Sequence, residues 1–460
     1  MKKTRLAVAL AIIFSASGTV LAADSTEVQV LKQQMETMQK QMAAMQNKLE
    51  TMTASSQAPQ KTGEANAPLA ANIGGANVTL YGFADLSADV GNDGKQGVKQ
   101  VSSNLSYVGV RASKNLGATG MKAIVQVETL ANISGTPTET GALASRNSFV
   151  GLAGGFGKLM LGKTDTPYKR ATGMMDPFSS SVGDYNSIMG NTGGDLRAEF
   201  DARVPHSIFY DSPKFHGFSV NALFSPGQKF DNLAGSDKYA FAQGEKICAG
   251  ATPGSSGSTL DAGSTLCNDG AFKNAYSLAF NYESGPLLGT VDYERHQSVD
   301  RTGDTGGITS DESAAKIGVS YNFGSNRLSG IYEKFSRDGS IAPGVNERAR
   351  NGYYVSDVQQ LGNGMDLMGA WAHAAQTPGG PDFGAVDDKA NMYALGLKYH
   401  YDKQLALYVV GAMLKQDTGA HYTIGAGGHG TAIASPRSDA GDTIPGETIK
   451  ALSVGMQYAF

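Results

Sequence analysis

Hydrophobic and polar residues alternate along most of the chain, from Val78 to its last residue. In the first such stretch, VTLYGFADLSADV, Val78 and Leu80 fall on one face and Tyr81 on the other. A period of two predicts a β-strand with one apolar and one polar face. The pattern predicts about sixteen strands, an even number. They span 78–90, 103–114, 121–130, 145–153, 157–163, 206–213, 216–225, 274–283, 286–297, 313–323, 326–336, 350–361, 364–375, 389–401, 403–415 and 447–460.

The connections between these strands alternate between short and long. Short turns such as ESGPL, FGSNR, LGNGM and YDK are followed by long loops near 226–273, 298–312, 337–349, 376–388 and 416–446. This asymmetry is typical of outer-membrane barrels, which have short periplasmic turns and long extracellular loops. Strands of about ten residues also match the length that a tilted strand needs to cross a bilayer. We therefore expect an all-β fold, a closed antiparallel transmembrane β-barrel of about sixteen strands over residues 77–460.

One long segment, residues 164–205, interrupts this alternation. A structureless connection of this length is uncommon and is usually functional or disordered. Its apolar side chains are numerous enough to pack against a wall, so we expect it to fold inward, narrow the lumen and form the filter of a pore. The apolar residues are Met174, Met175, Phe178, Tyr185, Ile188, Met189 and Phe200, and the acidic residues expected near the wall are Asp184, Asp195, Glu199 and Asp201.

The first 22 residues have the pattern of a secretory signal peptide. Lys2, Lys3 and Arg5 precede an apolar core over 6–14, and small residues predict cleavage after Ala22. The alternative is an N-terminal membrane anchor, which the short core disfavours because it cannot span about 30 Å. We expect the mature protein to be exported.

Residues 23–54 carry a heptad repeat. Apolar residues recur at alternating spacings of three and four, which predicts an α-helical coiled coil. An amphipathic helix lying on the barrel or on a membrane is the alternative, but the polar face is rich in Gln rather than in Lys and Arg. Methionine specifies oligomer number poorly, so the repeat leaves dimer and trimer open. The predicted core residues are Val28, Leu31, Met35, Met38, Met42, Met45, Leu49 and Met52, and an aperiodic linker is expected over 55–76.

Composition restricts the class of protein further. The 460 residues include 59 Gly, and 41% are hydrophobic, which suits a turn-rich β protein rather than a disordered chain. Loss of Lys2, Lys3 and Arg5 with the signal takes the formal charge from -4 to -7, which disfavours a nucleic-acid partner. In an exported chain, Cys248 and Cys267 are expected to form a disulfide. Two isolated thiols supply too few ligands for the alternative, a zinc site.

The sequence predicts no cofactor and no enzymatic activity. The stretch GKLMLGKT at 157–164 matches the P-loop expression, but its interior reads as a strand and no helix follows to receive a phosphate. The 7 His are scattered, so no metal site is predicted. We find no nucleophile with a neighbouring base.

Several segments together resemble the general trimeric porins of Gram-negative outer membranes, especially the neisserial and betaproteobacterial branch. The segments are SYVGVRASKNLG at 106–117, SRNSFVGLAGGFGKLMLGKTDTP at 145–167, DP at 176–177, GDYN at 183–186, VPHSIFYDSPKFHGFSV at 204–220 and the terminal Phe460. The resemblance covers residues 77–460 and implies a trimer of water-filled barrels whose third extracellular loop, here 164–205, folds into the lumen. The coiled coil departs from the common pattern of this family.

The resemblance also implies a pore constriction. Arg146 and Arg203 match arginines of the family's wall, whereas Tyr107 stands where many relatives have a further arginine. Bases on one wall that face carboxylates on the loop create a transverse field, and the charge in excess sets the ion preference. The alternative for each residue is a solvated charge without effect on selectivity. The candidates are Arg111, Arg146, Arg203 and Glu128 on the wall, and Asp184, Glu199 and Asp201 on the loop.

These observations predict a passive diffusion porin for ions and small hydrophilic solutes. We expect a homotrimer in the outer membrane, in contact with its lipid and lipopolysaccharide. The coiled coil is expected in the periplasm, where it supports trimerisation or contacts the peptidoglycan cell wall. The alternative is a structural or adhesive barrel whose pore is incidental.

Overall fold

A computed structural model describes most of the predicted barrel. The described residues are 69–135, 143–190, 200–226, 272–300, 309–337, 349–377, 387–418, 420, 422–425, 429 and 446–460. The predicted signal peptide, the coiled coil over 23–54, the disulfide between Cys248 and Cys267, and the acidic residues Asp195 and Glu199 lie outside them. In the part that is described, no helix is long and apolar enough to cross a membrane.

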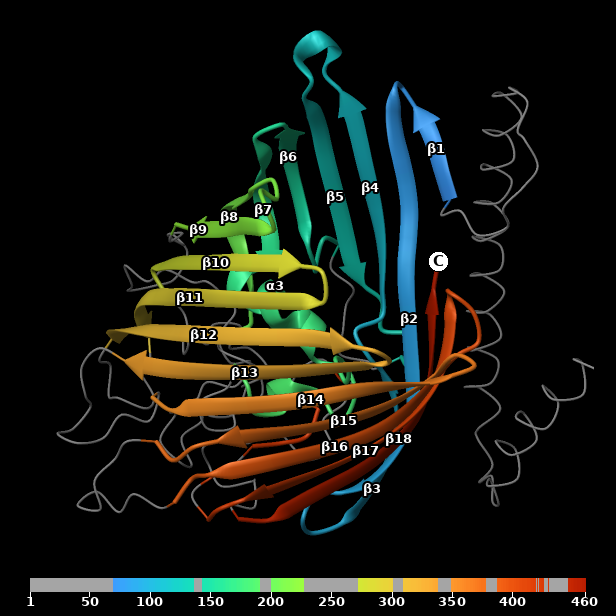
Figure 1. Cartoon of the computed structure of the whole chain (residues 1–460), viewed down its shortest axis with the longest axis vertical. Helices are drawn as coiled ribbons and strands as arrows, with labels where there is room; N and C mark the ends of the chain where they lie inside the picture. The colour runs from blue at the N-terminus through green and yellow to red at the C-terminus, as the bar shows by residue number, and fades with distance from the viewer. Residues whose placement is uncertain are drawn as a thin grey trace, which may run out of the picture. The chain divides into compact units, whose positions relative to one another are not determined.

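The strands form one closed antiparallel barrel (Figure 1). Strand β2 pairs with β18 along one edge and with β3 and β4, which lie end to end, along the other. Strands β1 and β18 likewise lie end to end along the first edge. Counting β3 with β4, and β1 with β18, as one wall position each, the 18 strands form a barrel of 16, as the sequence predicted. The strands are β1 Leu69–Ile73, β2 Ala76–Asn92, β3 Gly97–Ser103, β4 Tyr107–Asn115, β5 Lys122–Leu130, β6 Ser148–Gly154, β7 Gly157–Asp165, β8 Arg203–Asp211, β9 Phe218–Ser225, β10 Asn274–Ser284, β11 Leu287–Asp300, β12 Thr309–Phe323, β13 Asn326–Arg337, β14 Asn351–Gly362, β15 Met365–Ala374, β16 Ala390–His400, β17 Leu405–Gln416 and β18 Thr448–Ala459.

The two faces of strand β18 differ in exposure and polarity, as the alternation predicted. On β18, the outward Leu452 and Val454 are 46% and 54% exposed, whereas Ser453 between them is fully buried in the barrel. An apolar surface this continuous marks a membrane-facing wall rather than a surface that meets water.

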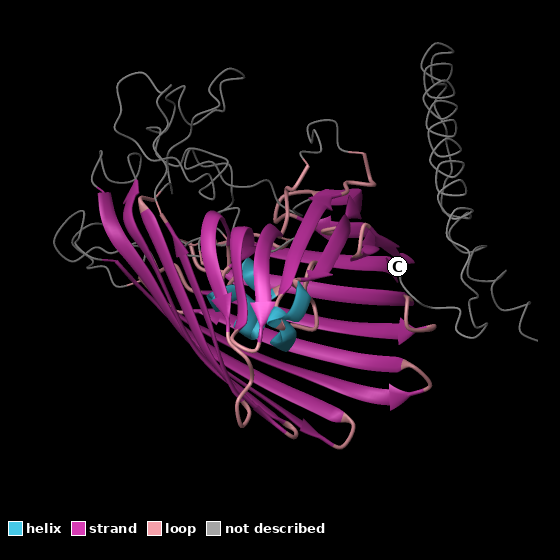
Figure 2. Ribbon diagram, turned by 90° about the horizontal axis from the view of Figure 1, so that it is seen from above, coloured by secondary structure: helices cyan, strands magenta, loops and turns pink. Residues whose placement is uncertain are grey.

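The described part of the connection between β7 and β8, residues 166–190 and 200–202, lies inside the ring of strands (Figure 2). It is called the constriction loop below. It contains helix α3 at Pro167–Thr172 and two 3-10 turns, η2 at Gly173–Met175 and η3 at Tyr185–Ser187. Helix α3 packs against β10 and β11, behind the front wall in Figure 1. The predicted inward fold of this loop is confirmed.

Two strands were not expected from the alternation. Strand β1 takes residues 69–73 of the stretch expected to be linker, and it pairs with β2 through a turn at Gly74 and Gly75. Both glycines have positive φ, 59° and 78°, which the tight hairpin turn requires. Strand β18 ends where Phe460 pairs with Gly82, and β1 continues along the same edge of β2. Strand β3, at 97–103, falls almost entirely between the predicted strands 78–90 and 103–114.

Candidate functional site

The constriction loop leaves the wall through a capped helix start. Thr166 precedes α3, and its hydroxyl accepts a hydrogen bond from the Lys169 backbone N–H at 3.3 Å, while Pro167 occupies the first turn. Both features favour a helix beginning at this residue. The helix carries Tyr168 inward, where its backbone N–H donates to the Ser277 hydroxyl of β10.

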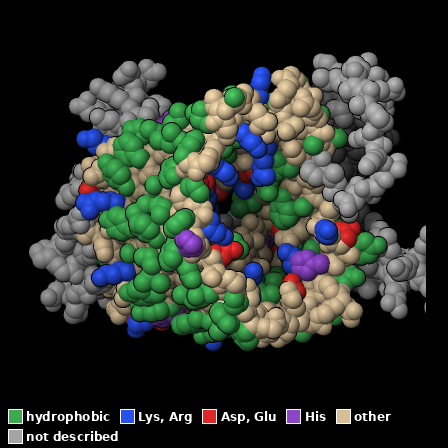
Figure 3. Space-filling view, turned by 45° about the horizontal axis from the view of Figure 1, so that its top comes forward, with side chains coloured by type: hydrophobic (Ala, Val, Ile, Leu, Met, Phe, Trp, Pro, Cys, Tyr) green, Lys and Arg blue, Asp and Glu red, His purple; other side chains and the backbone are tan. Residues whose placement is uncertain are grey.

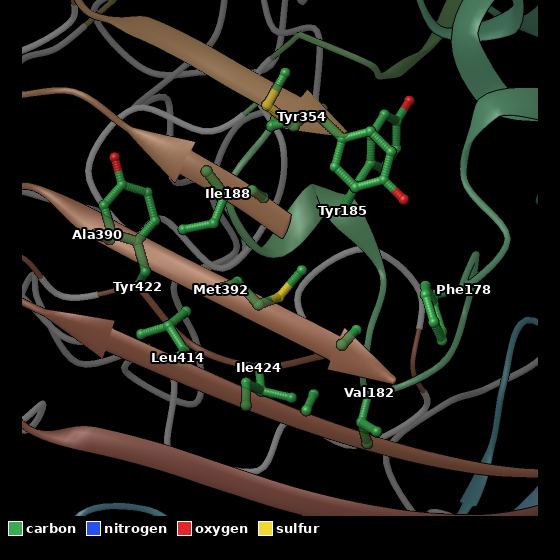
Figure 4. Close-up of a cluster of buried hydrophobic side chains, with 14 of the residues drawn as sticks. Phe178, Val182, Tyr185, Ile188, Tyr354, Ala390, Met392, Leu414, Tyr422 and Ile424 are labelled. Carbon is green, nitrogen blue, oxygen red and sulfur yellow. The ribbon is translucent and has the colours of Figure 1, made fainter. Parts of the chain in front are cut away.

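The wall that receives the loop is apolar, although most porin lumens are lined by polar residues. Many inward positions of β13 to β18 carry small or apolar side chains. Figure 4 shows Ile188 of the loop beside Met392 of this wall, and Phe178, Val182 and Leu414 belong to the same buried cluster. Burying each large apolar side chain contributes about 1.5–3 kcal/mol, so the loop is held inward mainly by the hydrophobic effect. The wall residues are Ile331, Tyr354, Val358, Met368, Ala372, Ala374, Ala390, Met392, Ala394, Tyr408, Val410, Ala412, Leu414, Ile449 and Ala451.

Two glycines of the wall leave room for the loop. A β-carbon at Gly396 would lie 2.9 Å from the ring of Phe178, and one at Gly318 would lie 2.9 Å from the sulfur of Met175. Both distances are shorter than a van der Waals contact. Side chains at these positions would therefore push the loop away from the wall.

Described residues of the last long connection also lie inside the barrel, among them 420, 422–425 and 429. Tyr422 and Ile424 join the apolar cluster under the constriction loop. The His429 imidazole lies 3.3 Å from the Asp89 carboxylate and 3.5 Å from the Ser87 hydroxyl, both on β2. The sequence predicted only a long extracellular loop here. Tyr422, Ile424 and His429 are not part of a periodic pattern, so their inward placement could not be predicted from hydrophobic periodicity.

The loop carboxylates are engaged within the loop itself. Asp184 accepts hydrogen bonds from the backbone N–H groups of Ser180 and Asn186, at 2.6 and 2.8 Å. Asp176 accepts from the backbone N–H groups of Phe178 and Tyr185. Burial, together with repulsion from Asp184, raises the pKa of Asp176 to about 8. Both carboxylates hold the turns of the loop.

Asp201 at the end of the loop lies in a buried charged network. Its carboxylate is 2.6 Å from the Lys316 ammonium and accepts a hydrogen bond from the Tyr185 hydroxyl at 2.7 Å. Nearby, Glu333 of the wall pairs with Arg350 at 3.4 Å and accepts from the Gly190 backbone N–H. Buried charges must be paired in this way, since an uncompensated charge would be strongly destabilising. This network fixes Gly190 and Asp201 of the loop to β13 and β12.

The opposite wall, from β4 to β8, carries the predicted arginines. Arg146 is 2.6 Å from the Glu128 carboxylate and lies over the Tyr107 ring at 4.7 Å. Arg203 is 3.0 Å from Asp165. Arg111 donates instead to the uncharged Gln126 amide at 3.0 Å and is exposed to the lumen. Figure 3 shows a hollow in one face of the molecule with Lys and Arg side chains on its walls.

Tyr81 links this wall together and was not among the predicted site residues. Its ring lies across Gly109 of β4, and its hydroxyl donates to Glu128 of β5 at 3.0 Å. The Arg111 guanidinium lies over the same ring, 4.0 Å from its centroid. A side chain at Gly109 would overlap the Tyr81 ring. The sequence did contain a signal for this contact. Gly109 lies between the inward residues Tyr107 and Arg111, and a glycine at an inward position leaves space for an aromatic ring from the neighbouring strand.

The structure thus divides the predicted site residues into two groups. Arg111, Arg146, Arg203 and Glu128 lie on one wall, where Glu128 partners Arg146. Asp184 and Asp201 are 2% exposed and have their hydrogen-bond partners within the loop and on β12. The carboxylate partners of the arginines are therefore wall residues, Glu128 and Asp165, rather than these two loop residues.

Residues 51–420 of the chain match the family of Gram-negative porins. The chain belongs to this family. The porin is 26% identical over 395 residues to outer membrane porin protein 32 of Delftia acidovorans, covering 84% of this chain and 94% of the relative. It is 27% identical over 335 residues to the major outer membrane protein P.IA of Neisseria meningitidis serogroup C, covering 69% of this chain and 79% of the relative. The resemblance found in the sequence is confirmed.

Solved structures agree with this fold. The anion-selective porin from Comamonas acidovorans has a TM-score of 0.62 and 22% identity, and the match covers 84% of this chain and all of that one. A trimer form of OmpT from Vibrio cholerae has a TM-score of 0.54 and 15% identity, and covers 84% of this chain and 99% of that one. Family and fold together make this porin a passive channel of the outer membrane.

Substituting Gly396 tests how the loop is docked. In Gly396→Leu, the new side chain collides with Phe178, and overpacking of this kind costs about 1–3 kcal/mol. We expect a loosened loop, seen as larger and noisier single-channel currents in planar bilayers. Gly369→Leu on the adjacent strand is the matched control, because a β-carbon at Gly369 meets no atom within 4 Å. Wild-type currents from Gly396→Leu would contradict the docking.

The raised pKa of Asp176 predicts that stability depends on pH. Its pKa is about 8 in the folded protein and 3.8 in the reference state. Between these values the folded protein binds the proton more tightly, so stability falls as pH rises and levels off above about 8. The unfolding temperature, followed by circular dichroism in detergent, should fall from about pH 5 to about pH 9 in the wild type.

Asp176→Asn should flatten this dependence, because an amide does not ionise. Asp402→Asn, in the exposed turn between β16 and β17, should keep the wild-type slope. Equal slopes in Asp176→Asn and the wild type would show that Asp176 is not the group responsible.

Proposed function

We propose that this porin is a homotrimeric diffusion channel for ions and small hydrophilic solutes that prefers anions. The observation that carries the proposal is the placement of charge around the lumen. The arginine wall faces the opening beside the docked loop, while Asp184 and Asp201 are buried behind their own hydrogen bonds. Because ion preference follows the charge in excess at the narrow part of a pore, exposed arginine favours anions.

The three arginines contribute unequally to this preference. Arg146 forms an ion pair with Glu128, and Arg203 forms one with Asp165. The opposite charges within each pair largely cancel in their effect on an ion in the lumen. On helix α3, Arg170 is likewise opposed by Asp211, whereas Lys169 shares the single Asp165 carboxylate with Arg203, so one positive charge stays in excess there. Arg111 has an amide partner, and its charge is not cancelled by that contact. We therefore assign the anion preference to Arg111 and to the positive charge in excess beside Asp165.

Two solved structures of similar fold support the proposed anion preference and trimeric assembly. The solved Comamonas acidovorans protein is described as anion-selective. The trimer form of Vibrio cholerae OmpT supports a trimeric assembly. The sequence resemblance to trimeric porins points to the same assembly, with lipopolysaccharide as the surrounding lipid.

Charge substitutions on the wall test the proposed selectivity. Arg111→Gln should lower the anion-to-cation permeability ratio, and Glu128→Gln should raise it by leaving Arg146 unopposed. We expect changes of roughly two- to fivefold, corresponding to a screened charge worth about 0.4–1 kcal/mol. The measurement is the reversal potential across a salt gradient in planar bilayers. Lys403→Gln, in the turn between β16 and β17, is the control for a distant charge.

Two outcomes would overturn parts of this proposal. An unchanged permeability ratio in both wall variants would remove Arg111 and Glu128 from the filter. No current from the wild type would favour the alternative, a structural or adhesive barrel.

We further propose that residues 23–54 form a periplasmic coiled coil that reinforces the trimer or contacts peptidoglycan. The support is the unbroken heptad repeat from Val28 to Met52. Deleting residues 23–54 should lower the temperature at which the trimer dissociates on electrophoresis, or reduce binding to purified cell-wall sacculi. A deletion variant equal to the wild type in both assays would refute this role.

A further inference from the structure

A row of polar and aromatic side chains crosses the outer surface of five neighbouring strands. The row consists of directly paired residues, one on each strand from β13 to β17: Tyr332, Tyr353, His373, Asn391 and Lys415. All five face outward, because the residues beside them in sequence face the lumen and are buried, as Ala372, Met392 and Leu414 show. We call these five residues the outer-rim row.

The outer-rim row lies at the extracellular end of the barrel wall. Tyr353, His373, Asn391 and Lys415 each lie within two residues of a strand end that leads into a long connection. The opposite ends of these strands lead into short turns, which face the periplasm in outer-membrane barrels. The row therefore lies at the level where the headgroups of the outer leaflet meet the barrel.

The rings of the row are held in place by one another and by Asn391. The Trp371 ring, one position below the row, stacks on His373 with centroids 5.8 Å apart, and His373 lies 6.0 Å from Tyr353. The Asn391 carbonyl accepts from the Trp371 indole N–H at 3.2 Å and from His373 Nδ1 at 3.0 Å. A surface fixed in this way is preorganised for a ligand, because binding does not have to order these rings.

A lysine stands at each end of the aromatic rings. Lys415 ends the row on β17, and Lys334 lies one position above Tyr332 on β13, both exposed. Within the described part of the chain, neither has an ion-pair partner, whereas the neighbouring Lys389 is paired with Asp387 at 2.8 Å. Four strand spacings separate the two lysines, about 19 Å, and flexible stems allow both ammonium groups to lean toward the rings between them.

The charge of this arrangement is complementary to an anionic ligand. A charged side chain on the lipid-facing surface is unfavourable unless it reaches the headgroup level and meets opposite charge. Aromatic faces between two cations fit a sugar core that carries a phosphate at each end. Below the row, the outward residues Val355 and Leu395 form an apolar surface that suits acyl chains.

We propose that the outer-rim row binds the phosphorylated glucosamine disaccharide of the glycolipid of the outer leaflet. Lys334 and Lys415 take its phosphates, Trp371, His373 and Tyr353 contact the sugar faces, and the acyl chains lie along the wall below. The inference rests on the proposed outer-membrane channel and adds to it a lipid site on the outside of the barrel.

The test measures retention of lipid A by the purified full-length protein. Protein in detergent is loaded with bis-phosphorylated lipid A, washed, and analysed by native mass spectrometry. Lys334→Gln with Lys415→Gln should retain roughly tenfold less lipid A than the wild type. Lys114→Gln with Lys403→Gln, at the periplasmic end, carries the same charge change and should retain wild-type amounts. Trp371→Leu, which keeps both lysines, should also retain less.

Further arms separate the ligand from other anions and from the channel. Dephosphorylated lipid A and phosphatidylglycerol should bind the wild type more weakly than lipid A, and inorganic phosphate should not displace lipid A at equal concentration. Equal retention by the double lysine variant, or equal binding of phosphatidylglycerol, would overturn the proposal. Single-channel conductance should be unchanged in all variants, because the row faces away from the lumen. A failure of the channel proposal would thus be seen separately, as absent wild-type current.

Discussion

The docking of one loop against an apolar wall determines the architecture of the lumen. Phe178, Val182 and Ile188 are buried because they pack against apolar inward side chains of β13 to β18. Gly396 leaves the space that the Phe178 ring occupies. Hydrophobic contact has no direction of its own, so polar contacts set the register of the loop. The Thr166 cap, the turns held by Asp176 and Asp184, and the Lys316–Asp201 pair do so along its length.

This docking also decides where the charge of the pore lies. The carboxylates of the described loop are used to fold it, and their lone pairs accept internal hydrogen bonds. The field in the remaining opening is then set by the far wall, where Tyr81 and Tyr107 order the side chains of Arg111 and Arg146. Such a filter combines a rigidly docked loop with a small excess of positive charge on the wall. Arg111 contributes to this excess because its nearest partner, Gln126, is uncharged.

Much of the fold could be predicted from the sequence, because a period of two is a local signal. The strands, their number and the inward loop follow from alternation and from the resemblance to porins. Strand β1 was missed because LAANI pairs on an exposed edge and has no buried face. The partners of Asp184 and Asp201 could not be predicted, since Lys316 is 115 residues from Asp201 and only the closed barrel brings them together. The role of Tyr81 depends likewise on the space above Gly109.

A disulfide across the docking contact tests this account most directly. A β-carbon at Gly183 of the loop would lie 2.9 Å from the Ala394 β-carbon of β16, close enough for two cysteines to bond after a small adjustment. In a chain with Cys248→Ser and Cys267→Ser, Gly183→Cys with Ala394→Cys should crosslink on mild oxidation. The single-channel conductance should be the same before and after reduction, because the loop is already docked. No crosslink, or a conductance that changes on reduction, would contradict a loop held against this wall.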